Sequence, residues 1–567
     1  MKKLIYIITL VIISINAEDA FKTPIIADRD CSTNEQDKND IVFGKTFYST
    51  RPQDSNTARK IMRFIPNKLY YDSYYDRDAS KLMNLCVEYQ KSFNSFSPKL
   101  AEWFLKDCKQ CLTLGPSDDT HCFDINSTQF GLLIPENKPS TICLSPKIDN
   151  LIIDFGIGFD LSRFICNLWT KMNLVFARCK TSIDLTTCGG SAQTGMLPPC
   201  VYSNNCKPEP VPYKSICSAL VGNQGQGSFP PLKFGKLTNS QSESGVASII
   251  FDLGYDLIRR ERGHLGANLH IVFPTGNRPN AQFLFEPIVG ANKCWQVGLG
   301  VNSSYDLYCS CDTKVGLYMD SILSHLFKSN QTRLFNLKSN GPLSQYLLLK
   351  KFDAQGDAYG IDRVANILAG ETKIGADIMF DGSLMLQVNR CNFFANIGYN
   401  LWVRTKEKRD DSVCFRDFLP DTFGIKGNLP LCTSVTMSCE CPLTDLTADL
   451  PDSVKNDLPS MAALPNPDCT PVNETLCQAV NTTASKSTIS CPAQADAETT
   501  YLKISDINFN APLHPTAISN KIFGSIGYNY DTCRFPIYCL IGAEVEFSNG
   551  NKAINQWGVL AKAGITF

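Results

Sequence analysis

Apolar and polar residues alternate with a period of two along much of the chain. From Ile374 to Val388 the even positions are apolar or glycine, while most of the odd positions are charged or polar. Successive side chains of a β-strand point to opposite faces, so this pattern predicts a strand with one apolar face. The run is about three times as long as a typical strand of a globular protein.

Twelve such runs occur along the chain, each about 9–17 residues long. A tilted β-strand needs about 9–11 residues to cross a bilayer. Short and long gaps alternate between the runs, and their number is even. These features predict an all-β fold, a transmembrane antiparallel up-and-down barrel with short periplasmic turns and long outer loops. The runs cover roughly 83–93, 151–159, 164–176, 248–257, 264–273, 294–308, 313–327, 372–389, 392–404, 520–530, 536–547 and 556–567. Weaker signals near 41–48 or within 344–352 would raise the number to fourteen.

A soluble β-sandwich would also show alternation. Against it stand the length of the runs, the unequal gaps, and aromatic residues at the ends of apolar faces, such as Tyr255, Phe273 and Tyr399. Sandwich strands usually recur every 8–12 residues. The barrel is therefore the favoured interpretation.

The N-terminus has the three parts of a secretory signal peptide. Met1-Lys2-Lys3 is basic, the stretch from Leu4 to Ile15 is largely apolar, and a cut after Ala17 is expected. The predicted organisation is a signal peptide over 1–17, a periplasmic or lumen segment over 18–80, and the barrel over 81–567. Its long loops are expected at about 94–147, 179–245, 328–371 and 405–519.

Composition adds the cellular compartment. The chain has 567 residues, a net charge of −1 and 25 cysteines. The charge argues against a general nucleic-acid binder, and so many cysteines indicate an oxidising destination. Sixteen cysteines fall in three of the long loops, where we expect disulfides to hold segments without a buried face of their own. Because the number is odd, at least one thiol is expected to be free, capped or bonded to another chain, and cysteines in the short turns could link neighbouring turns, subunits or envelope partners.

Metal binding and catalysis find little support in the sequence. Cys108-x-x-Cys111 has no second pair at zinc-finger spacing. His264 and His270 share a predicted lumen face with Asp252 and Asp256, but no catalytic motif accompanies them. We therefore predict no enzyme activity, no metal and no cofactor.

The final strand carries the most specific motif. Phe567 ends the chain, and apolar residues occupy every second position before it, from Trp557 to Ile565. This pattern resembles the C-terminal strand of bacterial outer-membrane β-barrels, which in that class is recognised by the barrel-assembly machinery and closes the cylinder against the first strand.

The resemblance extends over the chain from about residue 80. It is to the porin-like barrels, including the cysteine-rich major outer-membrane porins, and to uncharacterised barrel proteins of small-genome intracellular bacteria. In the latter, stretches such as Arg51–Asn56 and Asn400–Lys408 recur. The resemblance implies an outer-membrane location and contact with outer-membrane lipid, and it carries over no functional residues.

The expected function is passive or facilitated diffusion of small solutes through a polar lumen, by a monomer or a trimer. Acids outnumber bases on the predicted lumen face, and charged rings of one sign bias ion selectivity, so mild cation preference is expected. The predicted lining residues are Glu88, Asp154, Asp160, Asp252, Asp256, Asp320, Asp377, Asp381, Arg404, Glu544 and Glu546. The alternatives are a structural or adhesive surface protein anchored by a barrel, and a hydrophobic-ligand transporter with its N-terminus as a plug.

Overall fold

The computed structural model divides the chain into two units, Met1–Ile41 and Val42–Phe567. The described residues all belong to the second unit, so the predicted signal peptide lies outside them. They are 44–62, 81–105, 109–115, 124–135, 138–189, 213, 215–221, 229–238, 240–260, 262–310, 312–338, 342–354, 358–425, 501–530, 536–548 and 551–566. In this part of the chain, no helix is both long and apolar enough to cross a membrane.

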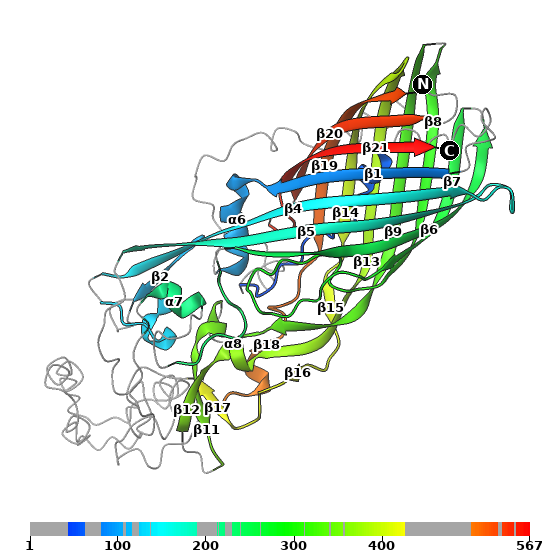
Figure 1. Cartoon of the computed structure of the whole chain (residues 1–567). Helices are drawn as coiled ribbons and strands as arrows, with labels where there is room; N and C mark the ends of the chain where they lie inside the picture. Colours follow the sequence, from blue (N-terminus) through cyan, green and yellow to red (C-terminus); the bar gives the residue numbers. More distant parts are fainter. Residues whose placement is uncertain are drawn as a thin grey trace, which may run out of the picture. The chain divides into compact units, whose positions relative to one another are not determined.

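Twelve long strands form a closed antiparallel barrel (Figure 1). Each pairs with its neighbours in sequence order, and β1 closes the cylinder by pairing with both β21 and β4. The predicted fold class, a twelve-stranded up-and-down barrel, is confirmed. The strands are β1 (Lys81–Ser92), β4 (Ser140–Asp160), β5 (Leu168–Gly189), β6 (Gln241–Arg260), β7 (Gly263–Phe273), β8 (Gln296–Cys309), β9 (Thr313–Leu334), β13 (Ala369–Arg390), β14 (Phe393–Arg404), β19 (Ala517–Tyr530), β20 (Ile537–Ser548) and β21 (Gln556–Thr566).

The alternation in the sequence becomes an inner and an outer face. On β1, Leu85 and Val87 point outward and are exposed, whereas Cys86 and Glu88 point inward and are buried. The other strands repeat the scheme, with branched aliphatic and aromatic side chains outside and small or polar ones inside. A closed barrel pairs every strand on both sides, so the sheet has no exposed edge.

Five strands are longer than the predicted 9–17 residues: β4, β5, β6, β9 and β13 have 20–22 residues and extend into segments predicted as loops. Two further details differ from the sequence-based boundaries. Phe164, which was included in the third run, lies in the turn after β4 and is 85% exposed; the strand itself begins at Leu168. The weak signal within 344–352 corresponds to a strand outside the barrel wall, β11 (Leu348–Phe352). The barrel therefore has twelve strands and not fourteen.

Aromatic side chains lie over inward-facing glycines of neighbouring strands. A Cβ at Gly254 on β6 would lie 2.0 Å from the ring of Trp169 on β5. The Trp169 indole N–H also donates a hydrogen bond of 2.9 Å to the Asp256 carboxylate. This close approach of ring to backbone is possible only because position 254 has no side chain.

We expect Gly254→Ala to destabilise the barrel by about 1–3 kcal/mol, because the added methyl group overpacks the site and displaces Trp169 from its hydrogen bond. The matched control is Gly245→Ala on the same strand, where a Cβ would meet no atom within 4 Å. Urea unfolding in lipid vesicles, followed by tryptophan fluorescence, measures both. Equal stability of the two variants would contradict the packing argument.

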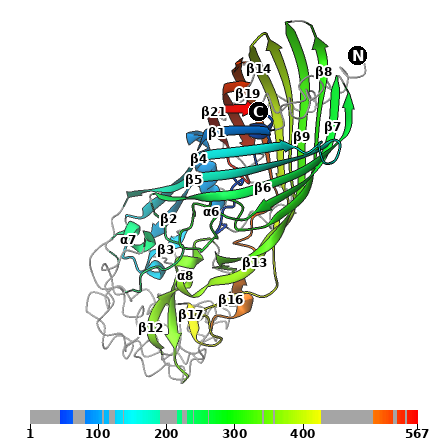
Figure 2. The same ribbon diagram turned by 45° about the vertical axis from the view of Figure 1, so that its right-hand side comes forward.

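The described parts of the long loops fold into a cap at one end of the barrel (Figures 1 and 2). Its described elements are η1 (Asn94–Phe96), α6 (Ser97–Phe104), β2 (Cys111–Gly115), β3 (Ile125–Asn126), η2 (Ser127–Phe130), α7 (Ile216–Val221), β10 (Asn336–Leu337), η4 (Ser344–Tyr346), β11, β12 (Ala358–Arg363), α8 (Val364–Ile367), β15 (Glu407–Arg409), β16 (Cys414–Phe415), β17 (Phe423–Ile425), η6 (Ile504–Asp506) and β18 (Ile507–Asn508). Strand β11 pairs with β12 and β17 to form a small separate sheet.

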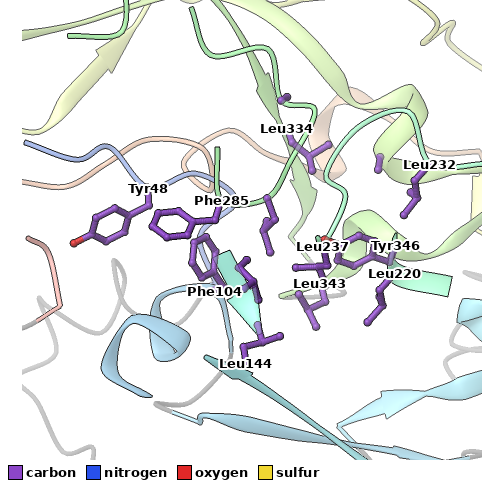
Figure 3. Packing of buried hydrophobic residues seen from close by; sticks show 14 of the residues in the cluster. Tyr48, Phe104, Leu144, Leu220, Leu232, Leu237, Phe285, Leu334, Leu343 and Tyr346 are labelled. Atoms are coloured by element: carbon purple, nitrogen blue, oxygen red, sulfur yellow. The ribbon is translucent and has the colours of Figure 1, made fainter. Parts of the chain in front are cut away.

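The cap has a hydrophobic core, which continues onto buried residues of the barrel strands such as Ile148 and Val175 (Figure 3). Phe104, Leu220, Phe285, Leu334 and Tyr346 are all buried there, although they come from five different segments of the chain. The expectation that these loops lack a buried face was wrong. Their apolar residues do not follow one regular period, so the core became visible only in three dimensions.

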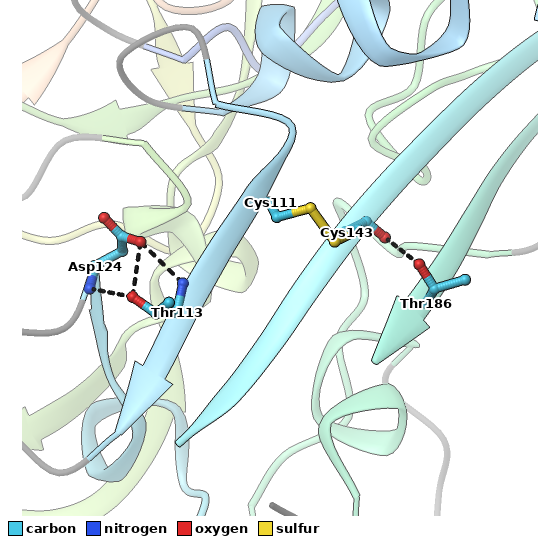
Figure 4. Close-up of a disulfide and its surroundings, with 5 residues drawn as sticks. All are labelled: Cys111, Thr113, Asp124, Cys143 and Thr186. Atoms are coloured by element: carbon cyan, nitrogen blue, oxygen red, sulfur yellow. Dashed lines mark hydrogen bonds between the residues drawn. A yellow bond between two sulfur atoms is a disulfide. The ribbon is translucent and has the colours of Figure 1, made fainter. Parts of the chain in front are cut away.

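One disulfide is present among the described residues, between Cys111 on β2 and Cys143 on β4 (Figure 4). These two residues face each other in the pairing of the two strands. Cys217 and Cys414, which also lie in the long loops, are unpaired. In the described part of the cap, apolar packing therefore involves many more residues than disulfide bonding does. Of the four cysteines in the short turns, Cys309 and Cys391 are exposed and unpaired. The other two, Cys311 and Cys533, lie outside the residues that the structure describes.

Candidate functional site in the barrel lumen

The lumen contains a segment of the chain that precedes the first strand. Residues 44–62, which we call the plug, are largely buried and end in a short helix, α4 (Thr57–Ile61). Asn56 caps this helix, with its side-chain oxygen accepting a hydrogen bond of 3.1 Å from the Arg59 N–H. This N-terminal hydrogen bond fixes the first turn of the helix, from which Arg59 reaches the barrel wall.

Two plug arginines form ion pairs with the wall. The guanidinium of Arg51 lies 2.9 Å from Asp381 on β13 and 2.9 Å from Glu546 on β20. That of Arg59 lies 3.3 Å from Glu88 on β1 and 3.5 Å from Asp154 on β4. All of these side chains are at most 8% exposed.

Hydrogen bonds add to these ion pairs. The Asn56 amide donates to Glu88, and the Thr57 N–H donates to Asp381 at 3.3 Å. The Lys562 ammonium on β21 donates to the Arg59 carbonyl at 3.3 Å. The plug is thus bound to the wall by charge as well as by packing.

Small cavities lie between the plug and the barrel wall. Two cavities between it and the wall each have a volume of about 10 Å³, which is enough for roughly one water molecule. One lies beside Ser49 and Arg404, and the other beside Asp54 and His270. At these two places the plug lies close against the barrel wall.

Other wall charges are paired with each other. Lys521 on β19 lies 2.5 Å from Glu544. Asp256 accepts from His264 at 2.7 Å, and Asp252 lies 2.6 Å from His270. The two Asp–His pairs that the sequence singled out therefore exist, both buried on adjacent strands β6 and β7.

The structure places the sequence-predicted lining residues in three settings. Eight are buried on the inner face: Glu88, Asp154, Asp252, Asp256, Asp381, Arg404, Glu544 and Glu546. Asp320 is half-buried and follows the inward alternation of Tyr318 and Ile322, while Asp160 lies at the end of β4 and accepts a hydrogen bond from the Ser162 N–H.

Asp377 differs from the expectation, because it lies on the outer side and pairs with Lys408. The pairing of β13 with β9 shifts register between Ile374 and Ala376 and again between Ala376 and Met379. A shift of one residue exchanges the faces of a strand. Odd positions from Met379 onward face inward, whereas Lys373 before the irregularity and Asp377 within it do not. The uniform alternation in the sequence gives no sign of this change.

The sequence-based interpretation assigned no role to Arg51 and Arg59. They precede the first strand and belong to no alternating run, so no pattern placed them in the lumen. Lys521 and Lys562 could have been found, since each occupies a polar position opposite an apolar face of its strand.

The β7–β8 connection, residues 274–295, also holds the plug. Gln53 donates to the Ile288 carbonyl at 2.9 Å and accepts from the Gly290 N–H at 2.8 Å. In the same connection, Glu286 is buried and accepts hydrogen bonds from the Asn280 and Gln282 N–H groups. Burial raises the pKa of Glu286 to about 7.

A carboxyl whose pKa is higher in the folded than in the unfolded protein binds extra protons when folded. We therefore expect stability to fall as pH rises from about 4.5 to 7, by about 3 kcal/mol at most. Glu286→Gln should remove this slope, whereas the exposed control Glu371→Gln should keep it. Urea unfolding in vesicles across this pH range checks it. An unchanged slope in Glu286→Gln would contradict the assignment.

Comparison with known proteins adds distant structural likenesses. No protein-family model and no curated protein sequence matches the chain. An outer membrane channel from Pseudomonas putida F1 is similar at 10% identity and a TM-score of 0.32, covering 86% of this chain and 96% of that one. A Pseudomonas aeruginosa FadL homologue is similar at 6% identity and a TM-score of 0.24, covering 86% of this chain and 90% of that one. The β domain of the Bordetella autotransporter BrkA is similar at 6% identity and a TM-score of 0.25, covering 86% of this chain and 100% of that one. The strand pairing, and not these similarities, establishes the barrel.

Proposed function

We propose that the protein is a gated channel of the bacterial outer membrane, which admits small polar solutes when the plug moves. The observation that carries the proposal is the set of ion pairs from Arg51 and Arg59 to Asp381, Glu546, Glu88 and Asp154. When a segment held by polar contacts leaves the lumen, its charged groups and those of the wall can form hydrogen bonds with water instead. A segment held by apolar packing would lose its contacts without such a replacement.

The membrane location is supported by the outer face of the barrel. Its outward side chains are mainly apolar, and on β13 they run from Ile378 to Val388, which is about the span of the hydrocarbon layer. Aromatic residues such as Trp295 and Tyr530 lie near the ends of this band, as expected at membrane interfaces. Assembly through the C-terminal strand remains part of the proposal; Trp557 and Ile565 lie on β21, and Phe567 is outside the described residues.

Polar solutes are favoured over hydrophobic ones because the wall beside the plug is charged. Glu88, Lys521 and Glu544 are buried there, and an apolar ligand would have to pass them without offering any hydrogen bond. The proposal includes no catalysis: the two Asp–His pairs are assigned to the lining of the lumen. A hydrophobic-ligand transporter therefore fits the central lumen less well.

Planar-bilayer recordings and liposome swelling with the purified full-length protein test the proposal. We expect the wild-type protein to be closed most of the time and a variant with a weakened plug to conduct. A permanently open wild-type pore would contradict gating by the plug. A barrel that stays closed in every plug variant would instead favour an anchoring role, with the folded cap as the working part at the cell surface.

A further inference from the structure

The outer wall of the barrel carries a hollow where β9, β13 and β15 meet. Its volume is about 440 Å³, and we call it the basic hollow. It lies at the register irregularity between β9 and β13. Gly375 allows the two strands to approach closely there, since a Cβ at this position would lie 2.7 Å from the Leu326 carbonyl oxygen.

Three lysines line the basic hollow: Lys328 from β9, Lys373 from β13 and Lys408 from β15. Two carboxylates hold lysines in place, with Lys328 lying 2.5 Å from Asp410 and Lys408 pairing with Asp377. Lys328 and Lys408 are 43% and 53% exposed, so their ammonium groups remain accessible. The lining carries three positive charges against two negative ones, a surplus of one.

The basic hollow lies at the border of the apolar band. Phe327 is exposed immediately before Lys328, and its N–H donates to the Trp295 carbonyl at 2.9 Å. Trp295 in turn packs against Phe273, with ring centroids 5.0 Å apart. Exposed aromatic residues at this level mark the interface between hydrocarbon and headgroups. The three lysines are thus at headgroup height on the side of the cap.

We propose that the basic hollow binds the phosphate-bearing headgroup of a lipid in the outer leaflet, with the lysine ammonium groups donating hydrogen bonds to the phosphate oxygens. The inference rests on the membrane location within the proposed function. Lysine ammonium groups bind phosphate as point charges, and basic pockets on membrane proteins bind anionic headgroups. A lipid fits better than free phosphate because the exposed Phe327 lines the hollow, and the exposed Ile378 follows Asp377 of the lining in the chain, so apolar surface for an acyl chain lies next to the lysines.

The test measures lipid retained by the full-length protein. Protein is reconstituted in phosphatidylcholine vesicles that contain a minor fraction of phosphatidic acid, extracted in mild detergent, and analysed by native mass spectrometry. We expect Lys328→Gln, Lys373→Gln and Lys408→Gln together to reduce retention of phosphatidic acid, by about fivefold for each lysine. The matched control replaces three exposed cap lysines, Lys233, Lys338 and Lys503, by Gln and should retain the lipid.

A second variant tests the charge argument in the opposite direction. Asp377→Asn with Asp410→Asn raises the surplus from one to three positive charges and should increase retention. An equal loss in the control, or a decrease in the carboxylate variant, would overturn the proposal. Displacement of phosphatidic acid by inorganic phosphate at matched concentration would assign the site to the free anion instead. Retention does not depend on conductance, so a failed channel proposal is distinguishable from a failed lipid site.

Discussion

Replacing Arg51 and Arg59 together by Gln is expected to release the plug and make the barrel conduct. Each substitution removes a cation that lies between two buried carboxylates, of which Glu546 keeps a second ion-pair partner, Lys521 at 3.6 Å. Removing one member of a buried ion pair costs about 3–5 kcal/mol. Because 1.4 kcal/mol is a factor of ten, either loss shifts the equilibrium between inserted and released plug on the order of 10²-fold or more. The expected result is frequent long openings in planar bilayers and rapid liposome swelling.

The matched control for the arginine variant is Lys147→Gln. Lys147 pairs with Asp184 at 2.8 Å, but both side chains are more than a third exposed, and exposed pairs contribute about 0–1 kcal/mol. This variant should remain closed like the wild type. If the double arginine variant folds, as judged by urea unfolding, and is also closed, packing rather than charge holds the plug.

The released channel is expected to be clearly cation-selective. Once the plug arginines no longer compensate them, Glu88, Asp154, Asp381 and Glu546 line a conducting lumen, and a surplus of carboxylates attracts cations. The sequence-based expectation of mild cation preference thus becomes conditional on the plug. Reversal potentials under a salt gradient in the background of Arg51→Gln with Arg59→Gln measure the selectivity.

Neutralising these four carboxylates in the same background, as Glu88→Gln, Asp154→Asn, Asp381→Asn and Glu546→Gln, should move the reversal potential toward zero. The control neutralises four exposed carboxylates, Glu371 near the start of β13 and Asp411, Asp417 and Asp421 in the segment that follows β15. It should leave most of the selectivity in place. An equal effect of both sets would show that the mouth, and not the lumen, selects the ions.

Sequence alternation was a sufficient guide to the wall, since each strand has one apolar and one polar face. It located all twelve barrel strands and gave their pairing order, because neighbouring runs joined by short gaps pair as hairpins. It could not place Asp377. The face of a residue depends on the register of the strand next to it, and the irregularity between β9 and β13 has no counterpart in the pattern of either strand alone.

The sequence allowed a lumen position for residues 18–80, but it did not predict the core of the cap or the contacts of the plug, for another reason. Residues such as Phe104, Leu220 and Phe285 belong to segments far apart in the chain, and their common core depends on which segments the barrel brings to one end. Arg51 likewise has no periodic neighbour, and its partners are 330 and 495 residues away.

Local alternation thus determined that the chain forms a twelve-stranded barrel, because the two faces of a strand meet different surroundings whatever the rest of the chain does. Only the tertiary structure showed that the plug lies in the lumen and that its arginines form ion pairs with the carboxylates of the wall. Those facts depend on long-range contacts between charges, whose energies come from distance and burial rather than from residue type alone.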